Sequence, residues 1–136
     1  DGQPPDMRAQ VGWLAELAEL LAGDAYPFDA DSARRLAADE LATGWQSESG
    51  HGVAVHASPS RLDRLSEIRQ PTLVVHGTAD PVFPIEHGRA LATGIDGAVL
   101  LEFDRLGHET PAPMLDELVP VLIEHLRNAA AWPDRP

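Results

Sequence analysis

Two residues in the second half of the chain combine the types and the spacing that proton-transfer chemistry needs. Asp80 follows an apolar, β-branched run at residues 71–77, and His108 follows a second such run at residues 98–103. A carboxylate can accept the Nδ1–H of an imidazole and fix its tautomer. The imidazole can then take a proton from a hydroxyl nucleophile and return it to a leaving group. We therefore predict that Asp80 and His108 are catalytic.

Each of these residues also has an interpretation without chemistry. Asp80 precedes Pro81, and Asp-Pro is common in turns for backbone reasons alone. A histidine after a short loop, as at His108, is equally typical of the start of a helix. The two residues occur together, each just past a strand-like segment, and this favours the catalytic interpretation.

The other histidines are weaker candidates. We predict that His76 is packed at the end of a strand, that His87 is exposed on a helix, and that His125 is solvated on the last helix. His51 lies in a glycine-rich loop and carries no specific signal. A metal site needs clustered ligands, and His76 with Asp80, in a chain without cysteine, falls short of that. The sequence therefore predicts no metal and no cofactor.

Local patterns predict the elements that position Asp80 and His108. Apolar residues at helical spacing, with capping and stop residues, predict helices. The two continuous apolar runs favour strands buried on both faces, as in a parallel sheet covered by helices. The predicted helices span residues 7–22, about 32–43 with Asp31 as the cap, 85–93 and about 114–129, with a short helical turn at 60–65; the predicted strands span 71–77 and 98–103.

The predicted order divides the chain into a helical segment, residues 1–60, and a β-α-β-α segment, residues 61–136. The second pattern is typical of a doubly wound α/β fold. Two strands make a poor independent sheet, and residues 1–60 supply no others. We therefore expect exposed apolar faces, and either a homodimer or pairing with a missing N-terminal half. The buried face of the last helix is predicted to contain Leu115, Leu118, Val119, Leu122, Ile123 and Leu126.

Composition narrows the classes of partner and location. The formal net charge is −12, so the phosphate backbone of a nucleic acid would repel the chain. No apolar stretch is long enough to span a bilayer. The absence of cysteine leaves the compartment open, and a cytoplasmic location is the simplest expectation. The chain begins at Asp1 without a leader-like segment, which is typical of a chain cut from a longer one.

Several motifs resemble one known family. Residues 65–84 and 88–92 resemble the penultimate strand, acid loop and following helix of α/β-hydrolase-fold enzymes, and residues 107–109 resemble their histidine loop. Residues 26–29 and the helix after them resemble the cap of a subgroup of capped esterases that includes aclacinomycin methylesterase. The resemblance implies a helical cap over a parallel sheet, with a small apolar ester bound between them, and it favours helix at residues 53–57.

The part of such an enzyme that this sequence lacks is the nucleophile. Hydrolases of this fold place it on a sharp turn, typically Gly-x-Ser-x-Gly, and no such pattern occurs in the sequence. The resemblance therefore implies a Ser-His-Asp triad whose serine lies outside these 136 residues. Two alternatives stay open. One is a haloalkane dehalogenase or epoxide hydrolase with an aspartate nucleophile; the other is a non-catalytic interaction or dimerisation module derived from a hydrolase.

Overall fold

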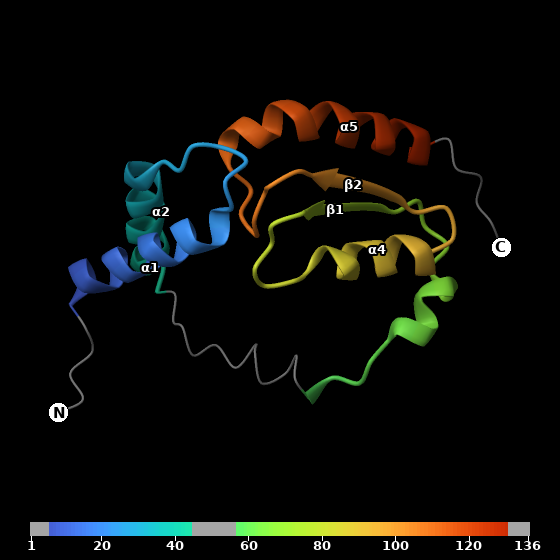
Figure 1. Cartoon of the computed structure of the whole chain (residues 1–136), viewed down its shortest axis with the longest axis horizontal. Coiled ribbons are helices and arrows are strands. Elements are labelled where there is room, and N and C mark those ends of the chain that lie inside the picture. The colour runs from blue at the N-terminus through green and yellow to red at the C-terminus, as the bar shows by residue number, and fades with distance from the viewer. Residues whose placement is uncertain (1–5, 45–56, 131–136) are drawn as a thin grey trace. The chain divides into compact units, whose positions relative to one another are not determined.

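Helices flank a pair of parallel strands. The computed structural model describes residues 6–44 and 57–130. In chain order the elements are α1 (Met7–Ala22), α2 (Ala30–Ala42), the 3₁₀ helix η1 (Leu62–Glu67), β1 (Leu73–Gly77), α4 (Ile85–Gly94), β2 (Val99–Phe103) and α5 (Ala112–Ala130), as Figure 1 shows. The predicted α/β class is confirmed. The helix predicted at residues 53–57 lies outside the described residues.

The end of α1 and the start of α2 follow from local chemistry. α1 has its predicted bounds, and Gly23 after it has a φ of 72°, a left-handed conformation that glycine adopts without steric cost. The cap of α2 is Asp29, so the prediction of Asp31 was wrong. Asp29 Oδ1 accepts a hydrogen bond from the backbone N–H of Ser32 at 2.9 Å, whereas Asp31 already lies in the first helical turn.

β1 and β2 form a parallel pair in the register Leu73 with Val99 through Gly77 with Phe103. Two parallel strands in register end at the same edge of the sheet. The loops that follow β1 and β2 therefore start side by side, and these are the loops that carry Asp80 and His108.

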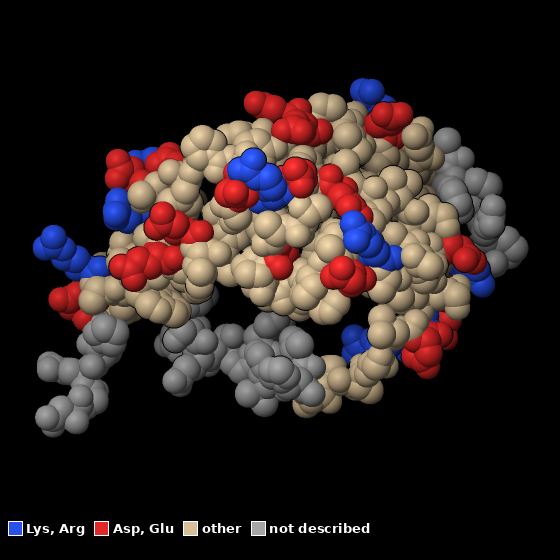
Figure 2. Space-filling view, in the orientation of Figure 1, with Lys and Arg blue, Asp and Glu red and all other residues tan. Residues whose placement is uncertain are grey.

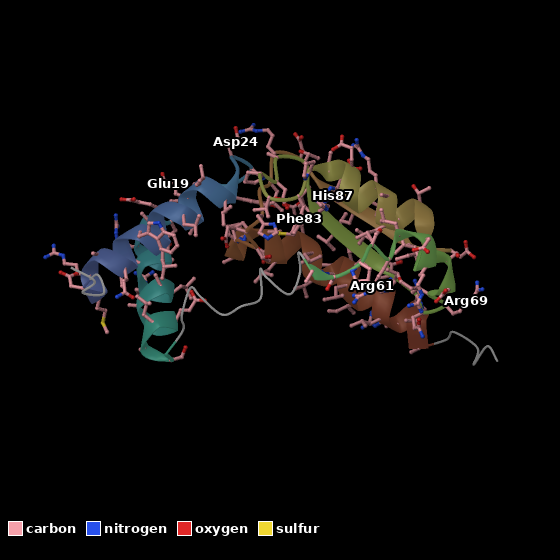
Figure 3. All side chains as sticks on the ribbon, turned by 90° about the horizontal axis from the view of Figure 1, so that it is seen from below. Glu19, Asp24, Arg61, Arg69, Phe83 and His87 are labelled. Carbon is pink, nitrogen blue, oxygen red and sulfur yellow. The ribbon has the colours of Figure 1, made fainter. Side chains whose placement is uncertain are left out.

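α4 and α5 lie on opposite sides of the strand pair (Figure 1 and Figure 3). On the α4 side, the His76 ring lies so close to Gly88 that a Cβ added there would be 2.7 Å from its Nδ1 atom. On the same side, the Arg89 guanidinium binds the Glu102 carboxylate with Nε 2.8 Å from Oε1. Glycine at position 88 therefore lets α4 pack closely against β1.

The core lies on the α5 side of the strands. It consists of Phe103, Leu106 and Met114. Half-buried residues packed against this cluster are Ala25, Tyr26, Val75, Leu101 and Leu118. Burial of these side chains is the main force that holds α5 to the strands.

The predicted buried face of α5 was mostly wrong. Of its six residues only Leu118 is half-buried, while the other five are between 40% and 58% exposed. The physical reason is that two five-residue strands have too little area to cover this stripe. The expected exposure of an apolar face is confirmed for this helix, and what covers that face stays a prediction.

The chain divides into two compact units. The first takes in the described parts of Asp1–Leu20 and Phe28–Ser60, and the second takes in Leu21–Pro27 with the described part of Arg61–Pro136. The segment Leu21–Pro27 therefore packs with the strands and α5, although it lies within the first 60 residues. The prediction that residues 1–60 form a cap stays a prediction.

Charge is spread over the surface. Figure 2 shows acidic side chains across the visible face with arginines set among them. Several arginines are paired with carboxylates, among them Arg89 with Glu102 and Arg105 with Asp24. Among the helices of residues 6–44 and 57–130, none is long and apolar enough to cross a membrane.

Candidate active site

Backbone hydrogen bonds join the loop after β1 to the loop after β2. The N–H of Thr78 donates to the carbonyl of Phe103 at 2.9 Å, and the N–H of Ala79 donates to the carbonyl of Leu106 at 2.9 Å. The parallel register brings the loops together, and these bonds fix their separation. Asp80 lies one residue beyond them on the first loop, and His108 lies two residues beyond on the second.

The structure brings the two predicted residues into direct contact. Asp80 Oδ2 lies 2.8 Å from His108 Nδ1. A carboxylate can only accept in such a bond, so Nδ1 carries the proton and donates it. In the neutral imidazole, Nε2 then carries no proton and can act as a base. The Asp80 side chain is 6% exposed and that of His108 is 40% exposed, so a reactant can reach the histidine but not the aspartate.

The other Asp80 oxygen is also satisfied. Oδ1 accepts the backbone N–H groups of Val82 at 2.8 Å and Phe83 at 2.9 Å. Burial by itself raises the pKa of Asp80, but the hydrogen bond from His108 and those from Phe83 and Val82 outweigh it, so its pKa lies below the ordinary value of 3.8. Asp80 is therefore held as a carboxylate, the form that keeps His108 in the tautomer described.

His76 has a place in this site that its sequence position did not reveal. As predicted, its side chain is packed, with 11% exposed. Its Nε2 lies 2.7 Å from the carbonyl of Phe83, so Nε2 carries a proton and donates it. The same atom lies 3.7 Å from Asp80 Oδ2. The spacing of His76 and Asp80 is visible in the sequence, but by itself it indicates only an incomplete metal-ligand pattern.

Phe83 lies close to two histidine rings. Its ring centroid is 5.5 Å from that of His108 and 5.8 Å from that of His87, and Figure 3 labels Phe83 and His87 close together. Phe83 is 47% exposed. It therefore presents an apolar surface beside the exposed imidazole, where a bound molecule would touch it.

An open cavity of about 720 Å³ adjoins His108. Its apolar lining includes Val75, Phe83, Leu91, Leu106, Met114 and Leu118, and its polar lining includes His76, Asp80, His87, His108, Glu109 and Thr110. A cavity of this size lies in the range of small-molecule sites. The few polar groups lie around the imidazole, and the rest of the wall is apolar.

The remaining histidines take no part in the bond between Asp80 and His108. His87 is exposed, as predicted. The prediction that His125 is solvated was wrong, because this side chain is half-buried and its Nε2 lies 3.4 Å from the carbonyl of Pro71. His51 lies outside the described residues. Within the described ranges, no group of three or more His, Cys, Asp or Glu residues is placed to hold a metal ion.

Comparison with known proteins gives a family match. Residues 34–126 match the family described as TAP-like protein. Rhodomycin D methylesterase DnrP of Streptomyces peucetius is 34% identical over 81% of this chain and 38% of its own length. Rhodomycin D methylesterase DauP of Streptomyces sp. strain C5 is 33% identical over the same shares. The chain thus spans less than half the length of these curated relatives.

Solved structures agree on the fold. An esterase from Exiguobacterium antarcticum superposes with a TM-score of 0.67 and 20% identity, covering 90% of this chain and 45% of the esterase. The meta-cleavage product hydrolase CumD from Pseudomonas fluorescens IP01 superposes with a TM-score of 0.63 and 22% identity, covering 94% and 48%. At these identities the likeness supports the α/β-hydrolase fold and no particular substrate.

Proposed function

Since this chain belongs to the TAP-like family of α/β-hydrolases, we propose that it supplies the base and the orienting acid of an ester hydrolase. The observation that carries the proposal is the 2.8 Å contact between Asp80 Oδ2 and His108 Nδ1. It leaves Nε2 of an exposed imidazole as a proton acceptor beside a largely apolar cavity.

In the proposed reaction, His108 Nε2 takes the proton of a serine hydroxyl as the serine oxygen bonds to the ester carbonyl carbon. The resulting imidazolium is stabilised by the Asp80 carboxylate. His108 then gives the proton to the departing alkoxide, which leaves as an alcohol, and an acyl-enzyme remains. Water attacks the acyl group in the same way, with His108 again as base and then as acid, and the carboxylic acid is released.

The serine of this proposal lies outside these 136 residues, because the sequence contains no Gly-x-Ser-x-Gly turn. We propose that a segment beyond this chain carries it. The acid and base alone fit an aspartate nucleophile as well, as in dehalogenases and epoxide hydrolases. The relatives favour the ester, since two rhodomycin D methylesterases cover 81% of the chain.

The proposed substrate is a methyl ester of an apolar carboxylic acid. Besides these two relatives, a third, from Aromatoleum aromaticum, is a pimeloyl-[acyl-carrier protein] methyl ester esterase that is 36% identical over 55% of the chain. In this chain Phe83, Leu106 and Leu118 line the cavity beside His108. An apolar acyl group would bury its surface against them.

The direct test is His108→Ala in the whole protein, assayed with a series of methyl esters. Loss of the general base should lower kcat by roughly 10²–10⁴-fold. His125→Ala is the matched control, because His125 lies against Pro71 and does not line the cavity; it should change kcat by no more than about twofold. Persistence of most activity in His108→Ala would refute the role of His108. Turnover of haloalkanes or epoxides in place of esters would favour the aspartate nucleophile.

A further inference from the structure

The turn after α1 is bonded along its backbone to the loop that carries His108. The N–H groups of Asp24 and Ala25 donate to the carbonyl of Arg105 at 2.9 and 3.1 Å. In the other direction, the N–H of Gly107 donates to the carbonyl of Ala22 at 2.9 Å. These segments lie more than 80 residues apart in the chain, as the 81-residue separation of Asp24 and Arg105 shows.

The backbone of His108 itself belongs to this contact. Its N–H donates to the carbonyl of Leu21 at 2.6 Å. The imidazole is held by Asp80 at one end, and the backbone that bears it is held by Leu21 at the other. The position of the base therefore depends on residues 21–25 as well as on the acid.

Two glycines allow the close approach. A Cβ at Gly23 would collide with Gly107 N and lie 2.5 Å from the carbonyl oxygen of Arg105. A Cβ at Gly107 would collide with the carbonyl oxygen of Leu21. Any other residue at either position would push the turn and the loop apart, because the atoms it meets are backbone atoms that cannot rotate away.

Arg105 has an unusual backbone conformation at this contact. Its φ of 58° lies in the left-handed region, which a residue with a side chain rarely adopts. Its backbone N–H donates to Thr78 Oγ1 at 2.8 Å, and its guanidinium donates to Asp24 through Nε at 2.9 Å and Nη2 at 2.8 Å. The Arg105 and Asp24 side chains are 61% and 72% exposed, so their ion pair is weak. The backbone bonds and the glycines carry most of the contact.

We propose that residues 21–25 position His108 for its bond to Asp80, with Gly23 as the positioning residue on which the contact depends. The proposal deepens the proposed function, since it gives the base a support outside the two loops of the strand pair. A base must be held within a fraction of an ångström of its productive position to be effective. Residues 21–25 hold the His108 backbone by hydrogen bonds, so a change at Gly23 would move the imidazole without touching it.

Gly23→Ala tests this proposal, and Gly97→Ala is its matched control. The two glycines have φ values of 72° and 75°, so alanine meets the same backbone strain at both. A Cβ at Gly97 has nothing within 4 Å, so only Gly23→Ala opens the contact. The readouts are the amide exchange rates of Gly107 and His108 and the His108 Nδ1–H resonance, both by NMR on the whole protein, together with kcat and KM.

We expect Gly23→Ala to raise amide exchange at His108 by about tenfold or more relative to Gly97→Ala, because its acceptor is displaced. The His108 Nδ1–H resonance should weaken or shift, and kcat should fall about tenfold with a smaller change in KM. Equal exchange rates, resonances and kcat in the two variants would overturn the proposal. If the exchange rates and the resonance change in Gly23→Ala but the unchanged protein hydrolyses no ester, the positioning proposal stands and the proposed function is refuted.

If Gly23→Ala does not fold, amide exchange in the unchanged protein decides the matter. The N–H groups of Gly107 and His108 donate to the carbonyls of Ala22 and Leu21, so both amides should exchange at least about tenfold more slowly than in the unfolded chain. Exchange of both amides at the unfolded rate would overturn the proposal.

Discussion

His76 Nε2 lies 3.7 Å from Asp80 Oδ2, which is too far for a hydrogen bond, and its proton is donated to a neighbouring peptide group instead. That proton goes to the carbonyl of Phe83 at 2.7 Å, while the N–H of Phe83 donates to Asp80 Oδ1 at 2.9 Å. His76 therefore acts on the acid through the backbone of its loop. In the proposed mechanism, His76 would therefore be a positioning residue rather than a proton-transfer residue.

Replacing His76 should weaken catalysis without abolishing it. His76→Leu leaves the carbonyl of Phe83 without its donor and frees the acid loop, so kcat should fall by roughly tenfold. His76→Gln should recover most of the loss, because the Nε2 atom of glutamine can reach the same carbonyl. The measurement is kcat and KM for the best methyl ester, with His125→Leu as the control. A loss as large in His76→Gln as in His76→Leu would contradict the backbone role.

Asp80→Asn should remove most of the activity while preserving the conformation of the loop after β1. The amide oxygen of asparagine can still accept the N–H groups of Val82 and Phe83, so the turn is retained. Its NH₂ group then faces His108 Nδ1 and forces the proton to Nε2, which leaves no free base. We expect kcat to fall by about 10⁴-fold. Circular dichroism would confirm the fold, and activity within tenfold of the unchanged protein would show that Asp80 does not set the tautomer.

Acid should destabilise the protein in part through Asp80. Burial raises its pKa, but the bonds from His108, Phe83 and Val82 lower it more, so the folded-state pKa lies below 3.8. A carboxyl whose pKa is lowered by folding stabilises the folded state above its unfolded pKa, and this contribution is lost as the pH falls through the folded pKa. The stability advantage over Asp80→Asn should therefore be complete near neutral pH and shrink below about pH 4.

Urea unfolding midpoints at pH 7, 5 and 3 would measure this change. The difference between the unchanged protein and Asp80→Asn should be similar at the two higher values and smaller at the lowest. A difference that is constant down to pH 3 would mean that folding does not shift the ionisation of Asp80.

The position of the pair could be predicted because it follows from the strands. The runs before Asp80 and His108 are continuous, β-branched and bounded by glycine or proline, and the carboxyl ends of parallel strands share one edge. The helical spacing of apolar residues likewise predicted the helices. It did not distinguish Asp29 from Asp31 as a cap, because both are acids near the helix start and only backbone geometry separates them.

The support of the pair could not be predicted, because it depends on contacts distant in the chain. The bond between Asp24 and Arg105 joins residues 81 apart, and no local pattern marks either of them. In the sequence, Gly23 is only the glycine that follows the helix predicted at residues 7–22, and its packing against Gly107 has no signal at the level of spacing. The predicted buried face of α5 was mostly wrong for a related reason: an apolar stripe shows that a helix has a face to bury, not how much sheet is there to cover it.

The two loops also meet at Gly77, and this contact gives a final prediction. A Cβ at Gly77 would collide with the carbonyl oxygen of Leu106 and lie 2.5 Å from that of Gly107. Gly77→Ala should therefore push apart the loops of Asp80 and His108 and destabilise the protein by about 1–3 kcal/mol, the usual cost of overpacking. The fall in kcat should exceed that expected from stability alone, because the pair itself is separated.

Gly12→Ala is the control, because here the added methyl group meets no neighbouring atoms. Gly12 lies within α1, and a Cβ there has nothing within 4 Å. Alanine has the higher helix propensity, so this variant should be more stable by about 0.5–1 kcal/mol, with kcat unchanged. Urea midpoints and kcat for both variants would check the pair of predictions. Equal stability of Gly77→Ala and the unchanged protein would mean that the loops after β1 and β2 can separate without cost, and that their close contact does not hold Asp80 against His108.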